Sequence, residues 1–303
     1  MFIIKYKKIF VGISATLVIL SLISIFTFGL NPGIDFKGGT LAEVVYKTER
    51  PTQEALNENL EALNFGSILL QPTGELGYIV KSRSLSDSEH AELLKALSQN
   101  DKSPLTEVSF NSIGPSVGRE LTGKAIIAII LVSLAIICFI AFAFRKVSKP
   151  VSSWRYGLIA IVALLHDVVI PVGIFATLAH FYGAELDTLF VVAVLTILGL
   201  SVSDTIVIFD RIRENLRNQM TTANVDKTNF SEIVGKSLEQ SYVRSISTSF
   251  TVILVLLALF FFGPVTTKYF ALMLTAGMFF GTYSSIFLAS PLLVLIEEWQ
   301  KKE

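Results

Sequence analysis

The residues best suited to chemistry in this sequence are ionisable side chains that stand inside long apolar runs. Asp204 lies in the apolar run 186–209, and a helix places it about 9 Å inside that run from Asp210. Three hydroxyl side chains flank it, those of Ser201, Ser203 and Thr205. An ionisable group at membrane depth is costly unless it is paired or hydrated. Asp204 is therefore predicted to gain and lose a proton, with a permanent ion pair that serves packing as the alternative.

A second polar pair, His166 and Asp167, stands near the middle of the apolar run 156–182. Pro171 follows Asp167 by four residues, and a helical proline leaves the carbonyl four positions back without its hydrogen bond. A bend is therefore expected at the pair, with one residue facing the helix bundle and the other bracing it. The residues themselves favour a proton relay and structural hydrogen bonding equally.

Arg244 precedes the apolar run 246–263 and opens a polar stretch that continues into it. The hydroxyl residues of this stretch are Ser245, Ser247, Thr248, Ser249 and Thr251. A polar face at this depth requires a hydrated cavity or polar partners, so the arginine is predicted to reach inward and meet Asp204. The alternative is a positively charged anchor at the cytoplasmic edge.

Two further patterns on the expected helices have structural interpretations. Small residues recur every four positions in the run 269–296, which is typical of close helix contact, either internal or with a partner subunit. These residues are Gly277, Gly281, Ser285 and Ala289. The segment 210–217 carries opposite charges three residues apart, and it is interpreted mainly as an orientation signal that extends a helix into the cytoplasm.

The composition is typical of a membrane protein rather than a soluble enzyme. Hydrophobic residues make up 52% of the 303 residues and charged residues only 17%, against about a quarter in a soluble domain. The formal net charge is zero, so no basic surface is expected for a nucleic acid. The single cysteine, Cys138, and the three scattered histidines exclude a disulfide framework and a metal-ligand pattern. We expect neither an enzyme nor a bound cofactor.

Six apolar runs are long enough to cross a bilayer as helices. They cover residues 9–30, 124–144, 156–182, 186–209, 246–263 and 269–296. The first is too long for a signal-peptide core, and no small-residue cleavage site follows it, so it is expected to remain as a span. Basic residues gather at alternate ends of the runs, at Lys5, Lys7, Lys8, Arg145, Lys146, Lys149, Arg155, Arg211, Arg213, Arg217, Lys301 and Lys302. The positive-inside rule places both termini and the loops 145–155 and 210–244 in the cytoplasm.

Residues 31–123 form a predicted extracytoplasmic domain between residues 1–30, which hold the cytoplasmic N-terminus and the first span, and the bundle 124–303. Their composition is soluble, with eight basic and thirteen acidic side chains. Strands are expected at 40–47, 67–71, 76–81 and 105–113, and helices at 52–63 and 86–99. Pro72, Thr73 and Gly74 are expected to form a turn, and Ser86 with Glu89 fits a capping box. The order βαββαβ indicates a ferredoxin-like α+β domain that contacts another protein or a substrate, with a passive cap as the alternative.

Five stretches occur in the order found in the SecD/SecF family of protein-export membrane proteins, and the chain resembles the SecF branch of that family. They are GIDFKGGT at 33–40, IGPSVGREL at 113–121, the pair at 166–167, SVSDTIVIFDRIRE at 201–214, and the arginine-hydroxyl segment 241–251. The resemblance covers essentially the whole chain. Only the loop 218–229 is longer and more polar than the family pattern.

The resemblance implies a polytopic α-helical membrane protein whose six spans form half of an RND-like transporter. It implies SecD as a heterodimer partner, association with the SecYEG channel and YajC, and location in the bacterial inner membrane. The implied function is to use the proton-motive force to assist the release of exported, unfolded polypeptides. In the family, the residues matching Asp204 and Arg244 belong to the proton path, which His166 and Asp167 are predicted to join. The coupling ion is expected to be a proton, with sodium still open.

Two other functions remain open at this point. One is a stand-alone RND-like, proton-coupled exporter of lipids or small molecules, and the other is a structural scaffold for the channel. A complete RND-like exporter needs two six-span halves, and this chain supplies one. The chain is therefore predicted to need a partner or a second copy of itself.

Overall fold

The computed structural model describes residues 2–143, 153–222 and 229–300 and divides into two compact units. The helical unit contains Met1–Asn31, Ile127–Ala184 and Leu189–Glu303. The sheet unit contains Pro32–Ile126 together with Glu185–Thr188. The apolar runs thus lie mainly in the helical unit, and the soluble insert lies in the sheet unit.

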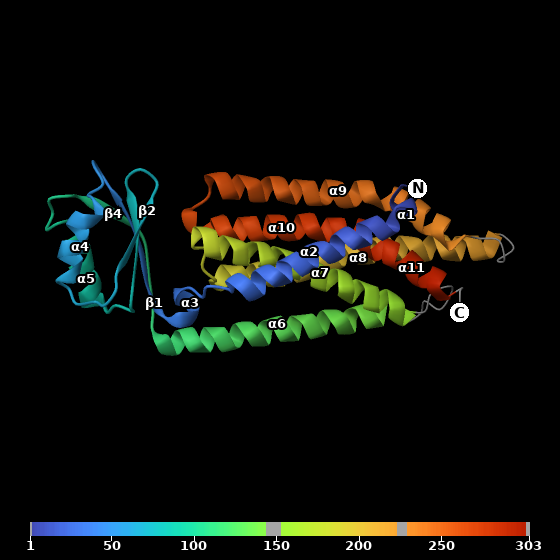
Figure 1. The fold of residues 1–303 in the computed structure, drawn as a ribbon, viewed down its shortest axis with the longest axis horizontal. Helices are drawn as coiled ribbons and strands as arrows, with labels where there is room; N and C mark the ends of the chain where they lie inside the picture. The colour runs from blue at the N-terminus through green and yellow to red at the C-terminus, as the bar shows by residue number, and fades with distance from the viewer. Residues whose placement is uncertain (1, 144–152, 223–228, 301–303) are drawn as a thin grey trace. The chain divides into compact units, whose positions relative to one another are not determined.

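Six helical segments in the described residues are long and apolar enough to cross a membrane, as expected from the sequence (Figure 1). The first four are α2 (Lys7–Phe28), α6 (Pro115–Ala143), α7 (Ser153–Tyr182) and α8 (Thr188–Thr222). The fifth is α9 (Phe230–Phe262), and the sixth joins α10 (Lys268–Ser284) to α11 (Ser290–Gln300) through a π-helical turn, Ser285–Ala289. A short helix α1 (Phe2–Lys5) precedes α2, and a 3-10 turn, Val265–Thr267, precedes α10.

Several helices extend beyond the apolar runs from which they were predicted. The second span begins at Pro115, α8 continues to Thr222, and α9 begins at Phe230. Hydropathy reports only the part of a helix that is apolar, so polar extensions into the aqueous phase escape it. Asn229 caps α9 by accepting a hydrogen bond from the amide of Ser231.

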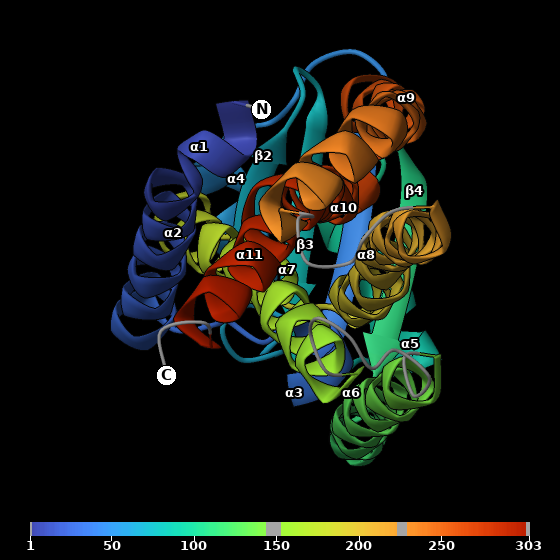
Figure 2. The ribbon, with the colours of Figure 1, turned by 90° about the vertical axis from the view of Figure 1, so that its right-hand side faces the viewer.

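The helices of the helical unit are buried to very different degrees. In the most apolar windows of α7, of α8 and of the sixth span, 56, 50 and 56% of residues are buried, against 11, 6 and 17% for α2, α6 and α9. Figure 2 looks along these helices and shows α2 and α6 at the periphery. The candidate residues at 166, 167 and 204 therefore lie on the helices that form the interior.

The start of α2 and the end of α11 lie at the same end of the helical unit (Figure 1). Lys7 of α2 forms an ion pair with Glu298 of α11. A chain that crosses a membrane an even number of times has its first and last residues on the same side. The contact between Lys7 and Glu298 agrees with six crossings.

The sheet unit has the predicted βαββαβ order. Its strands are β1 (Gly39–Tyr46), β2 (Leu69–Thr73), β3 (Gly77–Ser82) and β4 (Leu105–Ile113). Its helices are α4 (Gln53–Glu61) and α5 (Asp87–Leu97), after a short helix α3 (Ile34–Lys37). All neighbouring strands are antiparallel, in the order β2-β3-β1-β4, which is the ferredoxin-like topology.

One core joins the sheet to its two helices. Ala42 and Val44 of β1 are fully buried, as are Leu56 of α4 and Leu93 of α5. The hydroxyl of Tyr46 donates a hydrogen bond to the carbonyl of Leu97 at 3.0 Å, which ties β1 to the end of α5. This unit thus has a core of its own, as an independently folding domain requires.

The turn between β2 and β3 differs from the prediction. Pro72 lies inside β2, opposite Tyr78, and the turn covers residues 74–76. β2 is an edge strand, where the missing amide hydrogen of a proline is tolerated. Gly74, with a φ of +54°, begins the turn in the left-handed region.

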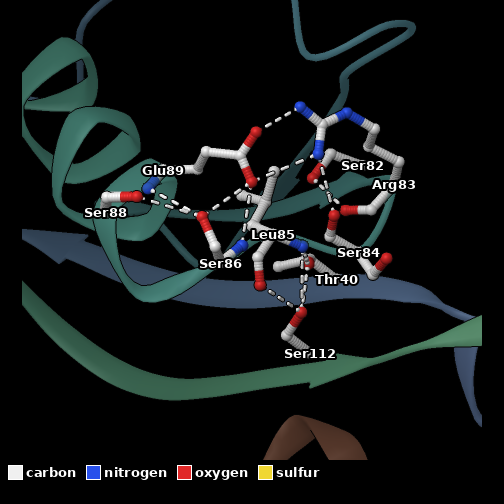
Figure 3. A network of polar contacts seen from close by, with 9 residues as sticks. All are labelled: Thr40, Ser82, Arg83, Ser84, Leu85, Ser86, Ser88, Glu89 and Ser112. Carbon is white, nitrogen blue, oxygen red and sulfur yellow. Dashed lines mark hydrogen bonds and ion pairs between the residues drawn. The ribbon is translucent and has the colours of Figure 1, made fainter.

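A polar network fixes the chain between β3 and α5 (Figure 3). The amide of Leu85 donates to Thr40 Oγ1 of β1 at 3.0 Å, and Ser112 Oγ of β4 donates to the Leu85 carbonyl at 3.0 Å. The predicted capping box of Ser86 and Glu89 is present. Arg83 forms an ion pair with Glu89, and its guanidinium lowers the pKa of that carboxyl to about 2.

We expect residues 39–113 to fold when expressed alone, because their core contacts all lie within the sheet unit. The measurement is circular dichroism with a thermal melt, and the expected result is a mixed α/β spectrum with cooperative melting. Leu93→Ala should lower the melting temperature, because it empties a fully buried site, whereas Glu58→Ala on the exposed face of α4 should not. A random-coil spectrum would contradict the prediction.

Candidate functional site

Asp167 is the most buried ionisable residue of the predicted site, with none of its surface exposed. Ser284 Oγ of α10 donates a hydrogen bond to Asp167 Oδ2 at 2.7 Å, and Ser201 Oγ of α8 donates to the same oxygen. His166 Nδ1 lies 2.8 Å from Asp167 Oδ1. Three helices, α7, α8 and α10, therefore supply polar groups to one carboxylate, as a buried polar group requires.

His166 is buried beside Asp167, with 3% of its surface exposed. Its ring stacks on Tyr283, with centroids 6.1 Å apart, and its Nε2 atom has no hydrogen-bond partner among the described residues. The two members of the pair contact each other, and both are buried. A buried ring nitrogen without a partner is a position for a proton or for a bridging water molecule.

Asp204 lies on α8 and is partly exposed, where α9 and α10 approach it. Thr282 Oγ1 of α10 donates a hydrogen bond to Asp204 Oδ2 at 3.4 Å, and the Thr282 hydroxyl also hydrogen-bonds that of Ser249 on α9. Ser245 of α9 is a near neighbour of this carboxylate, and its hydroxyl is buried. Asp204 is thus surrounded by hydroxyl groups, as predicted, but most of them come from other helices.

The predicted contact between Arg244 and Asp204 is absent. No ion pair within 4.0 Å joins them in the described structure, although Arg244 is close enough to act on Asp204 electrostatically. Arg244 is exposed and lines a polar pocket of about 360 Å³ with Asp210, Glu214 and Gln240. Its position five residues before Ser249 on α9, about one and a half turns, directs it to this pocket rather than to the carboxylate.

One polar segment of α10 touches the surroundings of both carboxylates. Thr282 contacts Asp204 and Ser284 contacts Asp167, while Ser285 shares a hydrogen bond of 2.8 Å with Thr205 on α8. The α-helix gives way to the π-helical turn at Ser285, and such turns are frequent at functional sites. A change in the charge of either carboxylate therefore acts on α10.

The element 33–40, which follows the first span, packs closely against the start of α6. Gly38 has a φ of +79°, and a Cβ added to it would lie 2.9 Å from Pro115 Cα at the start of α6. A Cβ at Gly118 would lie 2.9 Å from the carbonyl oxygen of Phe36. The backbones approach too closely here for side chains, which explains the glycines of this element.

Comparison with known proteins identifies the family. The profile of the protein export membrane protein SecD/SecF C-terminal region matches residues 93–299, and that of the SecD/SecF GG motif matches residues 23–49. The chain belongs to the SecD/SecF family of protein-export membrane proteins. The resemblance inferred from the motifs is thereby confirmed.

Two relatives are similar over nearly their whole length. The protein translocase subunit SecF of Thermobaculum terrenum is 42% identical, over 99% of this chain and 94% of the relative. The SecF subunit of Anaerolinea thermophila is 36% identical, over 97% of this chain and 94% of the relative. Within the SecD/SecF family, the chain is thus similar to SecF subunits.

Solved SecDF structures share the fold. The crystal structure of SecDF from Thermus thermophilus, described as a translocon-associated membrane protein, matches with a TM-score of 0.79 and 30% identity. A SecDF structure in a super-membrane-facing form matches with a TM-score of 0.67 and 30% identity. The match covers 98% of this chain but only 38% of the first SecDF chain. This member of the family is therefore a multi-pass membrane protein that corresponds to part of SecDF.

The small-residue stripe of this SecD/SecF chain faces the interior. A Cβ added to Gly277 would lie 2.3 Å from Ile197 Cγ1 of α8, and one added to Gly281 would lie 3.4 Å from Ser201 Cβ. Ser285 and Ala289 are also buried. The stripe packs α10 against α8, so it carries no argument for a partner. By contrast, no atom of the described residues lies within 4 Å of a Cβ built at Gly199 on α8.

Several functional contacts were missed by the sequence analysis. Ser284 and Thr282 were not identified, although the hydroxyl-rich stretch 282–285 inside an apolar run carries the same signal as 245–251.

The charged segment 210–217 forms ion pairs three residues apart, as predicted. Arg213 pairs with Asp210 at 2.8 Å and Arg211 with Glu214 at 2.6 Å. The predicted orientation signals Arg145, Lys146, Lys149, Lys301 and Lys302 lie outside the described residues.

Proposed function

We propose that this chain is an accessory subunit of bacterial protein export that works with a SecD-type partner. The pair uses the proton-motive force to assist the translocation or release of exported polypeptides on the outer side of the inner membrane. The observation that carries the proposal is the pair of carboxylates, Asp167 and Asp204, bridged by the hydroxyl segment of α10 in a protein-export family member. The proposal includes cytoplasmic termini.

A partner is part of the proposal. The chain aligns with 38% of a SecDF chain, which leaves room for a second membrane half. In this chain α2, α6 and α9 are the least buried spans, so their faces are available to lipid or to another subunit. We infer that a SecD-type protein supplies the second half, and that the SecYEG channel and YajC are further partners.

The proton follows the two carboxylates in this proposal. Asp204 takes up a proton, and the Asp167–His166 pair stores or passes one, since both lie among hydroxyl donors. In this proposal the proton leaves Asp204 towards the cytoplasm, past the pocket lined by Arg244, Asp210 and Glu214. A proton that crosses ~100 mV releases roughly 2 kcal/mol, which suffices to bias two states that differ by a few kcal/mol. No cofactor and no catalytic step are part of the mechanism.

The test combines purification with a transport assay. The chain should co-purify from native membranes with a larger, different subunit, and export into membrane vesicles should be stimulated by a proton gradient in its presence. A proton ionophore should remove the stimulation, whereas replacing sodium by potassium should not. Recovery of only monomers and homodimers would favour the alternative of a stand-alone RND-like exporter.

Arg244 provides a graded prediction. Arg244→Ala should lower the proton-stimulated part of export roughly ten-fold, the equivalent of about 1.4 kcal/mol, because it removes a cation that acts on Asp204 through space. Arg244→Lys should lower proton-stimulated export less than Arg244→Ala does, because lysine keeps the positive charge although it lacks the forked donor geometry of arginine. Lys8→Ala, which removes an exposed charge outside the pocket, is the control. Equal losses in the alanine and lysine variants would show that the charge of Arg244 is not what matters.

A further inference from the structure

Asp35 caps a helix that is far from it in the sequence. Asp35 Oδ2 accepts a hydrogen bond from the amide of Thr188 at 2.7 Å and another from Thr188 Oγ1 at 2.6 Å. Thr188 is the first residue of α8, so its amide is among the donors that a helix leaves unpaired at its start. A carboxylate at this position also interacts favourably with the helix dipole.

The distance along the chain makes this cap unusual. Caps are normally supplied by the residue that precedes the helix, but Asp35 and Thr188 are separated by 153 residues. A hydrogen bond between segments this far apart restricts the motion of both of them, which costs entropy. Starting the helix does not require that cost. The contact therefore connects the segment that follows the first span to the start of the fourth.

Neighbouring contacts strengthen the same connection inside the sheet unit. The amide of Gly33 donates to the carbonyl of Leu186 at 2.8 Å, next to a bridge between Pro32 and Leu186. Lys81 of β3 forms an ion pair of 2.8 Å with Glu185. The residues just before α8 are thus attached to the sheet and to α3 by side-chain and backbone contacts together.

α8 also carries the chemistry of the proposed function. It continues without interruption from Thr188 through Ser201 and Asp204 to Thr222. Ser201 contacts Asp167, and Asp204 contacts Thr282, so proton uptake at either carboxylate acts on this helix. Any displacement of α8 along its axis reaches Thr188 and then Asp35.

We propose that Asp35 is the positioning residue that transmits movement of α8 to the sheet unit. The inference rests on the proposed function, because it concerns how proton uptake on α8 reaches the sheet unit. Asp35 touches neither the proton nor the polypeptide. Its carboxylate keeps the first residue of α8 attached to the sheet unit.

The test uses the full chain, assembled with its SecD-type partner, and two measurements. Asp35→Ala should speed hydrogen exchange at the Thr188 amide about five-fold, the equivalent of the about 1 kcal/mol typical of a helix cap. The proton-stimulated part of export should fall at least as much, while export without a proton gradient and assembly stay at wild-type levels. Asp35→Asn should keep most of the stimulation, because its amide oxygen still accepts both hydrogen bonds.

Glu58→Ala, which removes an exposed carboxylate of α4 in the same unit, should change neither measurement. Unchanged exchange in Asp35→Ala, or faster exchange with full proton-stimulated export, would overturn the proposal. An equal loss of export with and without the gradient would also overturn it, since it would mean that Asp35 only stabilises the fold. If the wild-type chain itself shows no proton-stimulated export, the proposed function fails and this inference fails with it. Stimulation that survives in wild type and in Asp35→Ala refutes only the inference.

Discussion

Asp204→Asn is expected to abolish proton-stimulated export while leaving membrane insertion and partner assembly intact. Asparagine keeps the shape of the side chain and still accepts the hydrogen bond from Thr282, so the packing of α8 against α10 is preserved. It cannot bind and release a proton at neutral pH. The measurement is export into vesicles as a function of the imposed membrane potential, with the amount of assembled complex determined in parallel.

The control for this variant is an aspartate-to-asparagine change at a residue for which no function is proposed. Asp101→Asn alters an exposed turn residue whose φ of +69° asparagine tolerates well, so it should behave like the wild-type chain. If Asp204→Asn supports export at wild-type rates at every membrane potential, then the carboxylate is structural and the proton path proposed for α8 is wrong.

The second large effect is expected at Gly173, where α7 crosses α2. A Cβ added to Gly173 would lie 2.5 Å from Ser21 Cβ and 2.6 Å from Ser21 Cα, so the backbones themselves would have to separate. Ser24 Oγ also donates a hydrogen bond of 2.8 Å to the carbonyl of Gly173 and shares one with Thr177. Gly173→Ala should therefore cost about 2–3 kcal/mol, as overpacking in a close contact does.

A matched substitution on α8 separates crowding from a general effect of alanine. In the part of the chain that the structure describes, nothing lies within 4 Å of a Cβ built at Gly199, so Gly199→Ala should leave stability unchanged or raise it slightly. The measurement is the melting temperature of the purified protein in detergent. Equal melting temperatures for the two variants would contradict the close contact between α2 and α7.

The membrane spans were predictable because the bilayer imposes a length and a polarity on every helix that crosses it. The ends of these helices were not, since α8 and α9 continue into the aqueous phase on polar residues that hydropathy does not detect. In the sheet unit, the order of elements followed from periodicity and the capping box. The turn at Pro72 was misplaced, because only the sheet shows that this residue lies on an edge strand.

Gly173 and Gly199 show that the closeness of helix packing does not follow from the local sequence. A Cβ built at Gly199 has no described atom of a neighbouring element within 4 Å. Nothing in the surrounding sequence distinguishes Gly173, yet it makes a close backbone contact with α2. Both stand in apolar helical runs, and their surroundings differ only because distinct faces of α7 and α8 are covered.

The sequence by itself determined which residues are available for proton chemistry. An ionisable side chain at membrane depth is costly wherever its helix faces, so Asp167 and Asp204 were identifiable from position alone. The tertiary structure decided which groups surround them. Ser284 and Thr282 approach the two carboxylates because α10 packs between α7, α8 and α9, and Arg244 turns to a separate pocket. These contacts depend on the rotation of each helix about its own axis, which is set by the packing of all the helices together and not by any one segment.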